Sequence, residues 1–343
     1  MPNNLLKASI LLCINSLLVS LSAQELHIPE TCRDSAGFAL CKPGVPNKSP
    51  GRGLLLEYSL VGDQRMAPPS GPKDGPRSSK IGHVERFVGK IKLPIVHREG
   101  FNLLLGYEYS EEVFHFDHIG DYQTEVFTSL DGESLRTNQF AVYLTKALNE
   151  RMYLGAKLGT TYRGSYDGAM GFSPKHANYG ALGLLGIKPR PDLEWGVGLG
   201  FSKNFFQTIV LPFFIYNQTF NDRWGIESVL PVQIRLRYNA RPGDILLLGL
   251  EYQSDAYAVD VPTMVQADAG HYYFRHAEIA LKATYDKHLF SWAWFTAEAG
   301  FQVARRSRFD HSEREDLDFR VRSSPQPFFR TGLFLCPPRH LTE

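Results

Sequence analysis

Long runs in which apolar and polar residues strictly alternate are the feature that most constrains this fold. This period is typical of a β-strand with one apolar face. In the clearest run every second residue from Leu193 to Phe201 is apolar, and glutamate and glycine fill the positions between them. Similar runs begin near Leu54, Leu103, Met152, Trp224, Leu246, Ile279 and Phe295. We therefore expect an all-β fold.

The alternating runs are long, and the connections between them differ in length. Each run takes up about 9–13 residues, which exceeds the ~5–6 of a soluble strand and matches the ~9–11 that a tilted strand needs to cross a bilayer. Short connections fall at residues 94–100, 148–151, 188–192, 217–222 and 286–288, and long polar ones at 61–79, 111–135, 164–176, 255–270 and 304–324. Short turns on one side and long loops on the other are typical of outer-membrane barrels. A soluble β-sandwich is the alternative, although its strands are usually shorter.

Lipid imposes a further condition, because every backbone N–H and C=O group needs a partner there. A closed sheet meets this condition, so we expect a closed antiparallel up-and-down transmembrane β-barrel over residues 53–336. Our segmentation gives thirteen strands, which begin near Leu54, Val84, Phe101, Asn138, Met152, Ala177, Leu193, Gln207, Arg223, Asp244, Tyr272, Leu289 and Gln326. Single-chain bacterial barrels have an even number of strands, so one strand is missed or split and the prediction becomes 12 or 14. The error is expected at Pro212, at Pro231 or in the apolar patch at 122–127, because proline removes a donor from the ladder.

The N-terminus has the pattern of a cleaved secretory signal. Lys7 precedes an apolar stretch over residues 8–19, and small residues follow up to Ala23, as a signal peptidase site requires. A membrane-anchoring helix is the alternative, but Asn15 and Ser16 interrupt the stretch, which is shorter than the ~20 residues of a span. We predict a signal peptide at residues 1–23, a periplasmic N-terminal extension at 24–52 and a C-terminal tail at 337–343. The predicted location is the bacterial outer membrane.

Cysteine usage agrees with export. Cys32 and Cys41 are close enough in sequence to form a small disulfide loop in an oxidising periplasm. Metal binding by this pair is the alternative, but no histidine or second cysteine pair lies at zinc-finger spacing. Cys336 is left over, and the sequence allows it to be free or to replace one member of the pair.

The net charge is close to zero, and residues of both signs share the polar face of the strands. With 37 Lys+Arg and 36 Asp+Glu the formal charge is +1, so the basic excess of a nucleic-acid-binding protein is missing. Charges on the non-lipid face of a barrel must meet water or one another. They line a pore or form a salt-bridged plug, and the sequence leaves both open. The candidate lumen-lining residues are Glu57, Glu108, Lys157, Arg163, Glu194, Glu227, Arg235, Arg237, Glu251 and Glu298.

One segment has the residue types of a chemical site. His115, Asp117, His118 and Asp121 lie together in the second long connection, and imidazole with carboxylate can bind a transition metal or transfer protons. A surface loop rich in Asp and His is the alternative, so metal binding stays open. No Gly-x-Ser-x-Gly motif occurs, and we predict that the protein is not an enzyme and needs no cofactor. The charged segment at residues 305–316 is interpreted as a solvated external loop, with contact to anionic lipopolysaccharide as the alternative.

Two Leu-Pro pairs, at residues 211–212 and 230–231, bracket a turn that is followed by the strand start Asp222-Arg-Trp224. In these features the stretch 190–260, and more loosely 50–335, resembles an uncharacterised family of bacterial outer-membrane β-barrels that carries only a domain-of-unknown-function label. The resemblance implies an outer-membrane barrel and supplies no catalytic residues. The sequence departs from many such barrels at its end, because a tail follows Phe334 and Leu335 where those barrels finish on an aromatic residue.

These observations predict a passive channel or transporter for small solutes. A structural or binding barrel with a plugged lumen and exposed interaction loops is the alternative, and a membrane-embedded hydrolase is a distant third. The expected partners are outer-membrane lipid and small solutes, with lipopolysaccharide as a candidate and no nucleic acid. The solute and the oligomeric state are not predicted.

Overall fold

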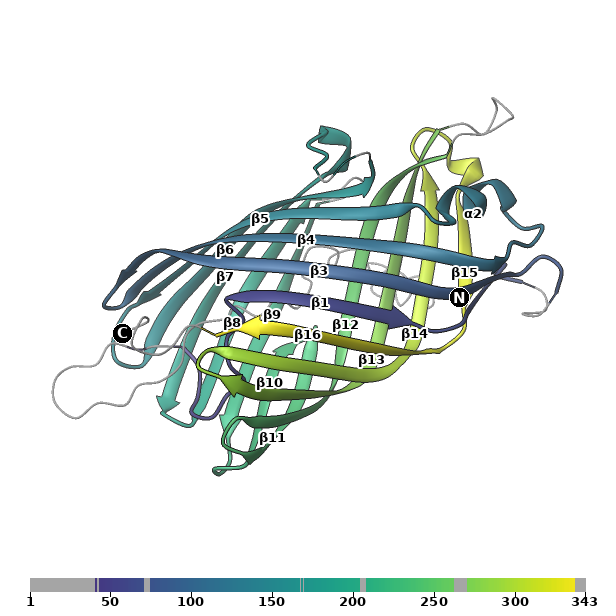
Figure 1. Cartoon of the computed structure of the whole chain (residues 1–343). Helices are drawn as coiled ribbons and strands as arrows, with labels where there is room; N and C mark the ends of the chain where they lie inside the picture. The colour runs from purple at the N-terminus through teal and green to yellow at the C-terminus, as the bar shows by residue number, and fades with distance from the viewer. Residues whose placement is uncertain are drawn as a thin grey trace, which may run out of the picture.

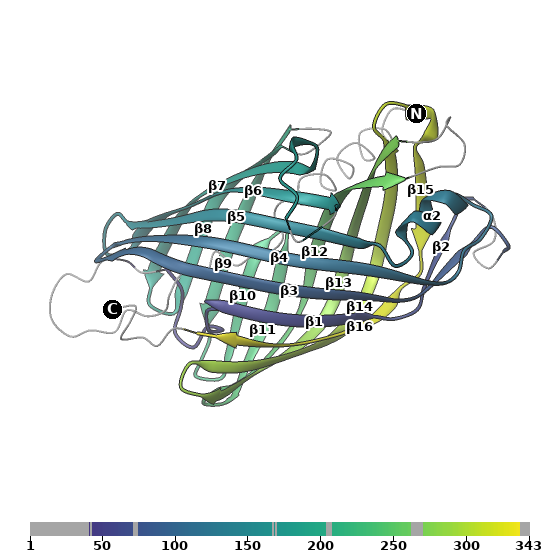
Figure 2. The ribbon, with the colours of Figure 1, turned by 45° about the horizontal axis from the view of Figure 1, so that its top comes forward.

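A computed structural model describes residues 41, 43–70, 75–166, 168, 170–203, 208–261 and 270–336. Over these residues the chain forms one closed antiparallel β-barrel (Figures 1 and 2). The helices found in this part of the chain are too short or too polar to cross a membrane. The predicted signal peptide at 1–23, most of the extension at 24–52 and the tail at 337–343 lie outside the described residues.

In the described residues strands make up almost all of the regular structure, and one α-helix and two short 3-10 helices lie in the connections. In chain order the elements are β1 (Leu54–Val61), β2 (Gln64–Ala67), β3 (Ser79–Arg98), β4 (Phe101–His118), α2 (Thr124–Leu130), β5 (Ser134–Ala147), β6 (Met152–Ser165), η1 (Pro174–His176), β7 (Ala177–Arg190), β8 (Leu193–Lys203), β9 (Thr208–Thr219), β10 (Trp224–Leu230), β11 (Gln233–Arg241), β12 (Asp244–Val261), β13 (Gly270–Phe290), β14 (Ala293–His311), η2 (Glu315–Leu317), β15 (Phe319–Ser323) and β16 (Gln326–Leu335).

Fourteen strands form the ring, which confirms the larger of the two predicted numbers. Each ring strand pairs with its neighbours in sequence, so the barrel is of the up-and-down type. The pairing of β1 with both β3 and β16 closes the ring. The short β2 continues β1 along β3, and the short β15 precedes β16 along β14, so these two strands add height at one end without adding a position to the ring.

The missing strand of the sequence segmentation is β11. Our segmentation merged it with β10 across Pro231, whereas the structure turns the chain there, with the N–H of Val232 bonded to the carbonyl of Val229 at 2.8 Å. Pro212, the other suspected position, stays inside β9, opposite Leu199 of β8. Proline therefore marks a turn in one Leu-Pro pair and is accommodated within a strand in the other.

The outer face of the barrel is apolar and the inner face is polar. On β1, Leu56 is 50% exposed whereas the next residue, Glu57, is 8% exposed. The same contrast recurs on β8 between Leu199, at 60%, and Glu194, at 2%. In water such an outer face would cost free energy, but in lipid it matches its surroundings, and the closed ladder leaves no sheet edge unpaired. The protein is thus a barrel of the bacterial outer membrane.

The connections differ between the two ends, as predicted. Six turns of two to four residues, at 99–100, 148–151, 191–192, 220–223, 242–243 and 291–292, lie at the end where β1 begins and β16 ends. Short turns and chain ends mark the periplasmic side of such barrels. The helix α2 lies at the opposite, external end (Figure 1). Strands β4 and β12 run further toward this end than expected, to His118 and Val261, so parts of the predicted loops 111–135 and 255–270 are strand.

Candidate functional site

All ten predicted lumen-lining residues lie on the inward face of the barrel. Seven of them are buried: Glu57, Glu108, Arg163, Glu194, Glu227, Arg237 and Glu298. The other three, Lys157, Arg235 and Glu251, are half-buried. The structure does not bring them into one site. It distributes most of them over several ion-pair networks, whereas Glu194 accepts hydrogen bonds from Tyr153 and Asn217. Whether they line a solute path stays a prediction.

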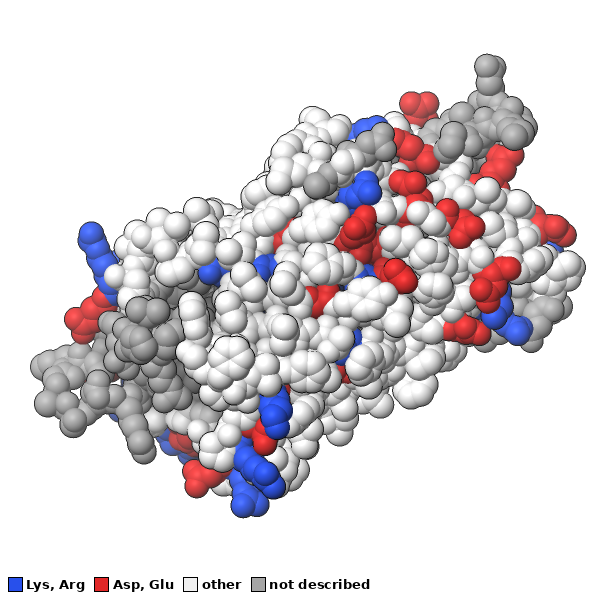
Figure 3. Space-filling view, in the orientation of Figure 1, with Lys and Arg blue, Asp and Glu red and all other residues white. Residues whose placement is uncertain are grey.

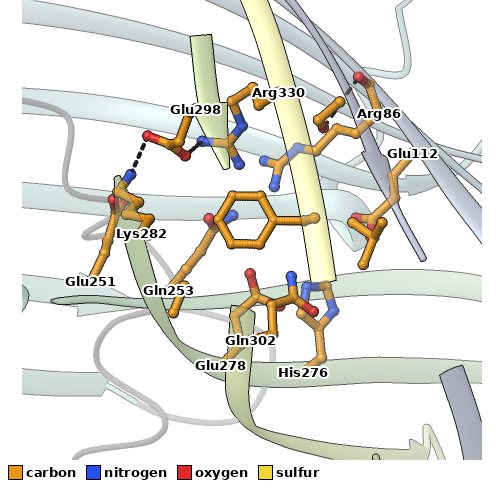
Figure 4. A pocket seen from close by; sticks show the side chains of 14 residues that line it. Arg86, Glu112, Glu251, Gln253, His276, Glu278, Lys282, Glu298, Gln302 and Arg330 are labelled. Atoms are coloured by element: carbon orange, nitrogen blue, oxygen red, sulfur yellow. Dashed lines mark hydrogen bonds and ion pairs between the residues drawn. The ribbon is translucent and has the colours of Figure 1, made fainter. Parts of the chain in front are cut away.

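The first network crosses five strands that are neighbours in the ring. Arg330 of β16 lies between two glutamates, with Nε 3.2 Å from Glu57 Oε1 and Nη1 3.1 Å from Glu298 Oε1. Lys282 of β13 continues the row, with Nζ 2.9 Å from Glu298 Oε2 and a second ion pair to Glu251. Figure 4 shows Glu298 bonded to both cations. Opposite charges thus alternate along the row, which offsets the cost of removing each from water.

These side chains enclose little free space. The cavity between them, lined also by Arg86, Glu112, Gln253, His276 and Phe328, measures about 30 Å³, enough for about two water molecules. This part of the wall is therefore tightly packed.

Two further networks lie on other parts of the wall. Glu227 of β10 binds two cations of β11, with 3.1 Å to Arg235 Nη2 and 3.1 Å to Arg237 Nη1. Asp255 of β12 lies 3.0 Å from Arg163 Nη2 of β6. Because Arg237 is 0% exposed and Asp255 is 1% exposed, loss of a partner would leave a charge in a site that water reaches poorly.

Residues 43–52, which we call the closing segment, lie inside the periplasmic end of the barrel. The Gly44 N–H donates to Glu194 Oε1 of β8 at 2.8 Å, and both the N–H and the hydroxyl of Ser49 donate to Glu227 at 3.0 Å. Arg52 Nη2 lies 3.3 Å from Asp286 Oδ1 of β13. The segment therefore reaches from one side of the ring to the other, and it is fixed mainly by side chains of the wall.

Further bonds hold the middle of the closing segment. The carbonyl of Pro46 accepts from Thr219 of β9 and from Arg237 at 3.4 Å, and the carbonyl of Asn47 accepts from Asn239 at 3.1 Å. Beside the segment an open depression of about 720 Å³ remains, bordered by Asn47 and by the turns at 220–223 and 242–243. The segment narrows the periplasmic opening rather than filling all of it.

An apolar cluster lies inside the external end of the barrel. Phe127 of α2 is 0% exposed and packs against Phe309 of β14, with ring centroids 6.0 Å apart. Phe309 stacks in turn on Phe274 of β13 at 4.6 Å. Val126 and Leu130 of α2 are buried in the same cluster. The helix thus places its apolar residues among inward-facing aromatic rings of the wall, where they exclude water.

The predicted chemical segment does not form one ligand set among the described residues. His115 lies in β4 rather than in an irregular loop, and its ring faces outward against the ring of His83, 4.5 Å away. Asp117 is 2.7 Å from Lys80 Nζ, His118 is exposed at the end of β4, and the N–H of Asp121 bonds to the carbonyl of Pro76. Alternating strand residues and a loop residue cannot converge as the sequence order suggested.

Some residues of these networks were missed by sequence reasoning. Ser49 and Arg52 fell in the predicted extension, and Asp255 fell in a predicted loop, so none was a lumen candidate. Asp255 follows the inward alternation of β12 and could have been found by extending that strand. For Cys41 the structure shows burial beside Tyr153 and Leu184, but Cys32 lies outside the described residues, so the disulfide stays a prediction.

One sequence family and several solved structures are similar to this chain. The sequence profile of a family described as "Domain of unknown function (DUF6268)" matches residues 128–335. No curated protein matches the sequence. An outer membrane channel from Pseudomonas putida F1 is similar in structure, with a TM-score of 0.45, 16% identity, and coverage of 88% of this chain and 100% of that chain.

Two more solved structures are similar at lower scores. For a Pseudomonas aeruginosa FadL homologue the TM-score is 0.42 and the identity 11%, over 83% of this chain and 90% of that chain. For the P. putida toluene transporter TodX the TM-score is 0.37 and the identity 8%, over 83% of this chain and 90% of that chain. Similarity at this level carries no information about what the present chain transports.

Proposed function

The chain belongs to that family of unknown function, and from its own geometry we propose that it is a passive outer-membrane channel for small solutes, whose periplasmic opening is narrowed in this structure by residues 43–52. A ring of ~8 strands is filled by its own side chains, whereas rings of ~16–18 strands leave an aqueous channel. A ring of fourteen strands lies between these cases, so what occupies the lumen decides whether it conducts.

One observation carries the proposal: the closing segment is no part of the wall. Its contacts with β8, β10 and β11 are hydrogen bonds to side chains such as Glu194 and Glu227. The wall ladder does not depend on these bonds, because every neighbouring pair of ring strands is joined by its own backbone pairing. The segment can therefore leave the lumen while the barrel stays closed in the membrane.

The plugged barrel is the second candidate. It is supported by the alternating charges from Glu57 to Glu251 and by the cavity of about 30 Å³ that they enclose. On this reading the barrel holds its external connections in place and conducts nothing. We propose no catalytic role in either case.

Conductance in a planar bilayer distinguishes the two candidates. The test variant is Gly44→Pro, because Gly44 has φ +100° and donates its N–H to Glu194, and proline can supply neither the angle nor the donor. The matched control is Gly168→Pro, at a glycine with φ +77° in an external connection. We expect brief steps from the native protein, longer or more frequent ones from Gly44→Pro, and native behaviour from Gly168→Pro. Silence from folded, inserted Gly44→Pro would reject the channel in favour of the plugged barrel.

A further inference from the structure

Two histidines and a glutamate come together on the outer face of the barrel near its external end. His83 of β3 is the register partner of His115 of β4, and their rings stack at 4.5 Å with 22° between the planes. Glu85, two residues further along β3, has Oε1 3.6 Å from His83 Nε2. One ligand atom from each of the three residues lies within 4.8 Å of the other two.

A local irregularity of β3 produces this arrangement. The register with β4 shifts between Ile81 and His83, so Gly82 is an extra residue in the strand. An extra residue reverses the alternation of the side chains that follow, and His83 faces outward although Ile81, two positions before it, is 0% exposed. A Cβ atom at position 82 would collide with the carboxylate of Asp117. The extra residue at position 82 therefore sets which way His83 points.

The residue types fit a particular class of metal ion. Imidazole nitrogen together with one carboxylate suits Zn²⁺ and neighbouring first-row transition metals, whereas Ca²⁺ and Mg²⁺ prefer sites made only of oxygen. Around Zn²⁺, with bonds of ~2.1 Å, tetrahedral ligand atoms lie about 3.4 Å apart. The ligand atoms now lie up to 4.8 Å apart, and rotation of the side chains can shorten these distances to that value. His83 is exposed, which leaves room for its ring to rotate.

The neighbouring residues place the cluster at the edge of the membrane band. Tyr58, Leu60 and Phe87 are about 40% exposed on the same outer face, toward the middle of the barrel. On the external side, Lys80 holds the carboxylates of Asp63 and Asp117 at 3.2 and 2.7 Å. Acidic side chains gather toward this end of the molecule (Figure 3), which raises the local concentration of cations.

We propose that His83, Glu85 and His115 form a binding site for Zn²⁺ or a similar divalent transition-metal ion on the external rim of the barrel. Three protein ligands leave a fourth position of a tetrahedral ion for water. Each imidazole binds a metal ion through the lone pair of a ring nitrogen, so the neutral form of the ring is the ligand. The site stands apart from the lumen and does not depend on the proposed channel.

Titration of the full-length protein with Zn²⁺ tests the site. The protein carries no affinity tag, is folded in detergent, and competes with a colorimetric zinc indicator at neutral pH. We expect one ion per chain, a loss of more than about tenfold in affinity for His83→Ala and for His115→Ala, and a smaller loss for Glu85→Gln. The controls are His118→Ala, in the same strand three residues on, and His97→Ala, at the other end of β3, both with native affinity.

Co²⁺ provides a second measurement, because its visible absorption reports the number of ligands and their geometry. The spectrum of the native protein should change on adding Co²⁺, and the change should be absent in His83→Ala. All these residues are at least partly exposed on the surface, so the variants should fold, which heat-modifiable migration in gels checks. The proposal is wrong if native protein binds no ion, or if His83→Ala and His118→Ala weaken binding equally.

Discussion

Replacement of Ser49 by alanine is the mildest way to loosen the closing segment. The Ser49 hydroxyl is 3.0 and 3.1 Å from the two carboxylate oxygens of Glu227, and all these groups are buried. A hydroxyl has one proton, so it donates one charge-assisted hydrogen bond, shared between the two oxygens. Such bonds contribute ~1.5–3 kcal/mol.

The lower end of that range applies here. After the substitution Glu227 still accepts from the Ser49 N–H, Arg235 and Arg237, so no buried charge loses all its partners. We expect the free energy that holds the segment in place to fall by about 1.5 kcal/mol, which makes the released state about tenfold more populated. The stability of the ring should stay unchanged, because Ser49 contacts no ladder bond.

Single-channel recording measures the open fraction, and urea unfolding of the same preparation measures barrel stability. Ser59→Ala is the matched control, since Ser59 is a buried serine of β1 whose hydroxyl bonds to the carbonyl of Arg86 within the wall. We expect about a tenfold higher open fraction for Ser49→Ala and a native one for Ser59→Ala. An unchanged open fraction in Ser49→Ala, or an equal rise in both variants, would refute the role of the segment.

Three further predictions concern stability. Glu298→Ala removes the buried partner that Arg330 and Lys282 share, although Arg330 keeps Glu57 and Lys282 keeps Glu251. Urea unfolding should therefore show a loss of about 1.5–3 kcal/mol; a loss under about 1 kcal/mol would show that water screens the network. Leu199→Arg puts a charge on a lipid-facing position that is 60% exposed. In liposomes it should lower the free energy of unfolding by about 2–4 kcal/mol if the position lies near the bilayer centre. A variant as stable as the native protein would place Leu199 outside the lipid. His176 lies in the connection between β6 and β7, where burial, and then the nearby Lys175, lower its pKa from the ordinary 6.5. When this connection opens, His176 takes up a proton more readily. The stability that the closed connection has above about pH 6.5 is therefore lost as the pH falls. Amide hydrogen exchange at residues 170–177, measured relative to its intrinsic rate, should therefore be faster at acid pH. His176→Gln should remove this pH dependence. The same pH dependence in both proteins would exclude His176 as its cause.

The wall of the barrel was predictable because the interactions that define it are recorded within each strand. Alternation along one strand decides which side chains meet lipid, as Leu199 and Glu194 show on β8, and no knowledge of other strands is needed. The parity of the ring corrected the strand count, and Pro231 was among the three positions at which the error was expected. The turn at Pro231 was missed because a Leu-Pro pair looks the same in a turn as it does within β9.

The contacts across the lumen could not be predicted in the same way. Gly44 and Glu194, or Ser49 and Glu227, meet only because the sheet curls into a ring, and nothing near either residue in the sequence records its partner. The pairing of His83 with His115 needs the exact register of β3 on β4, which the extra residue Gly82 shifts. The alternation in the sequence determines which face of a strand each side chain lies on. The contacts of the closing segment and the His83–His115 pair depend instead on the closure of the ring and on the register between strands.

The seam between β1 and β16 also sets an order of assembly. Leu54 of β1 pairs with Leu335 of β16, so the ring is complete only when the last strand has paired with the first. The closing segment directly precedes β1 in the chain, whereas its partners Glu194 and Glu227 lie on β8 and β10, about half the circumference of the ring away. A half-made, open sheet cannot present those carboxylates to the segment. On the proposed function, docking of the segment therefore requires the closed ring, and an incomplete barrel lacks the contacts that narrow the lumen.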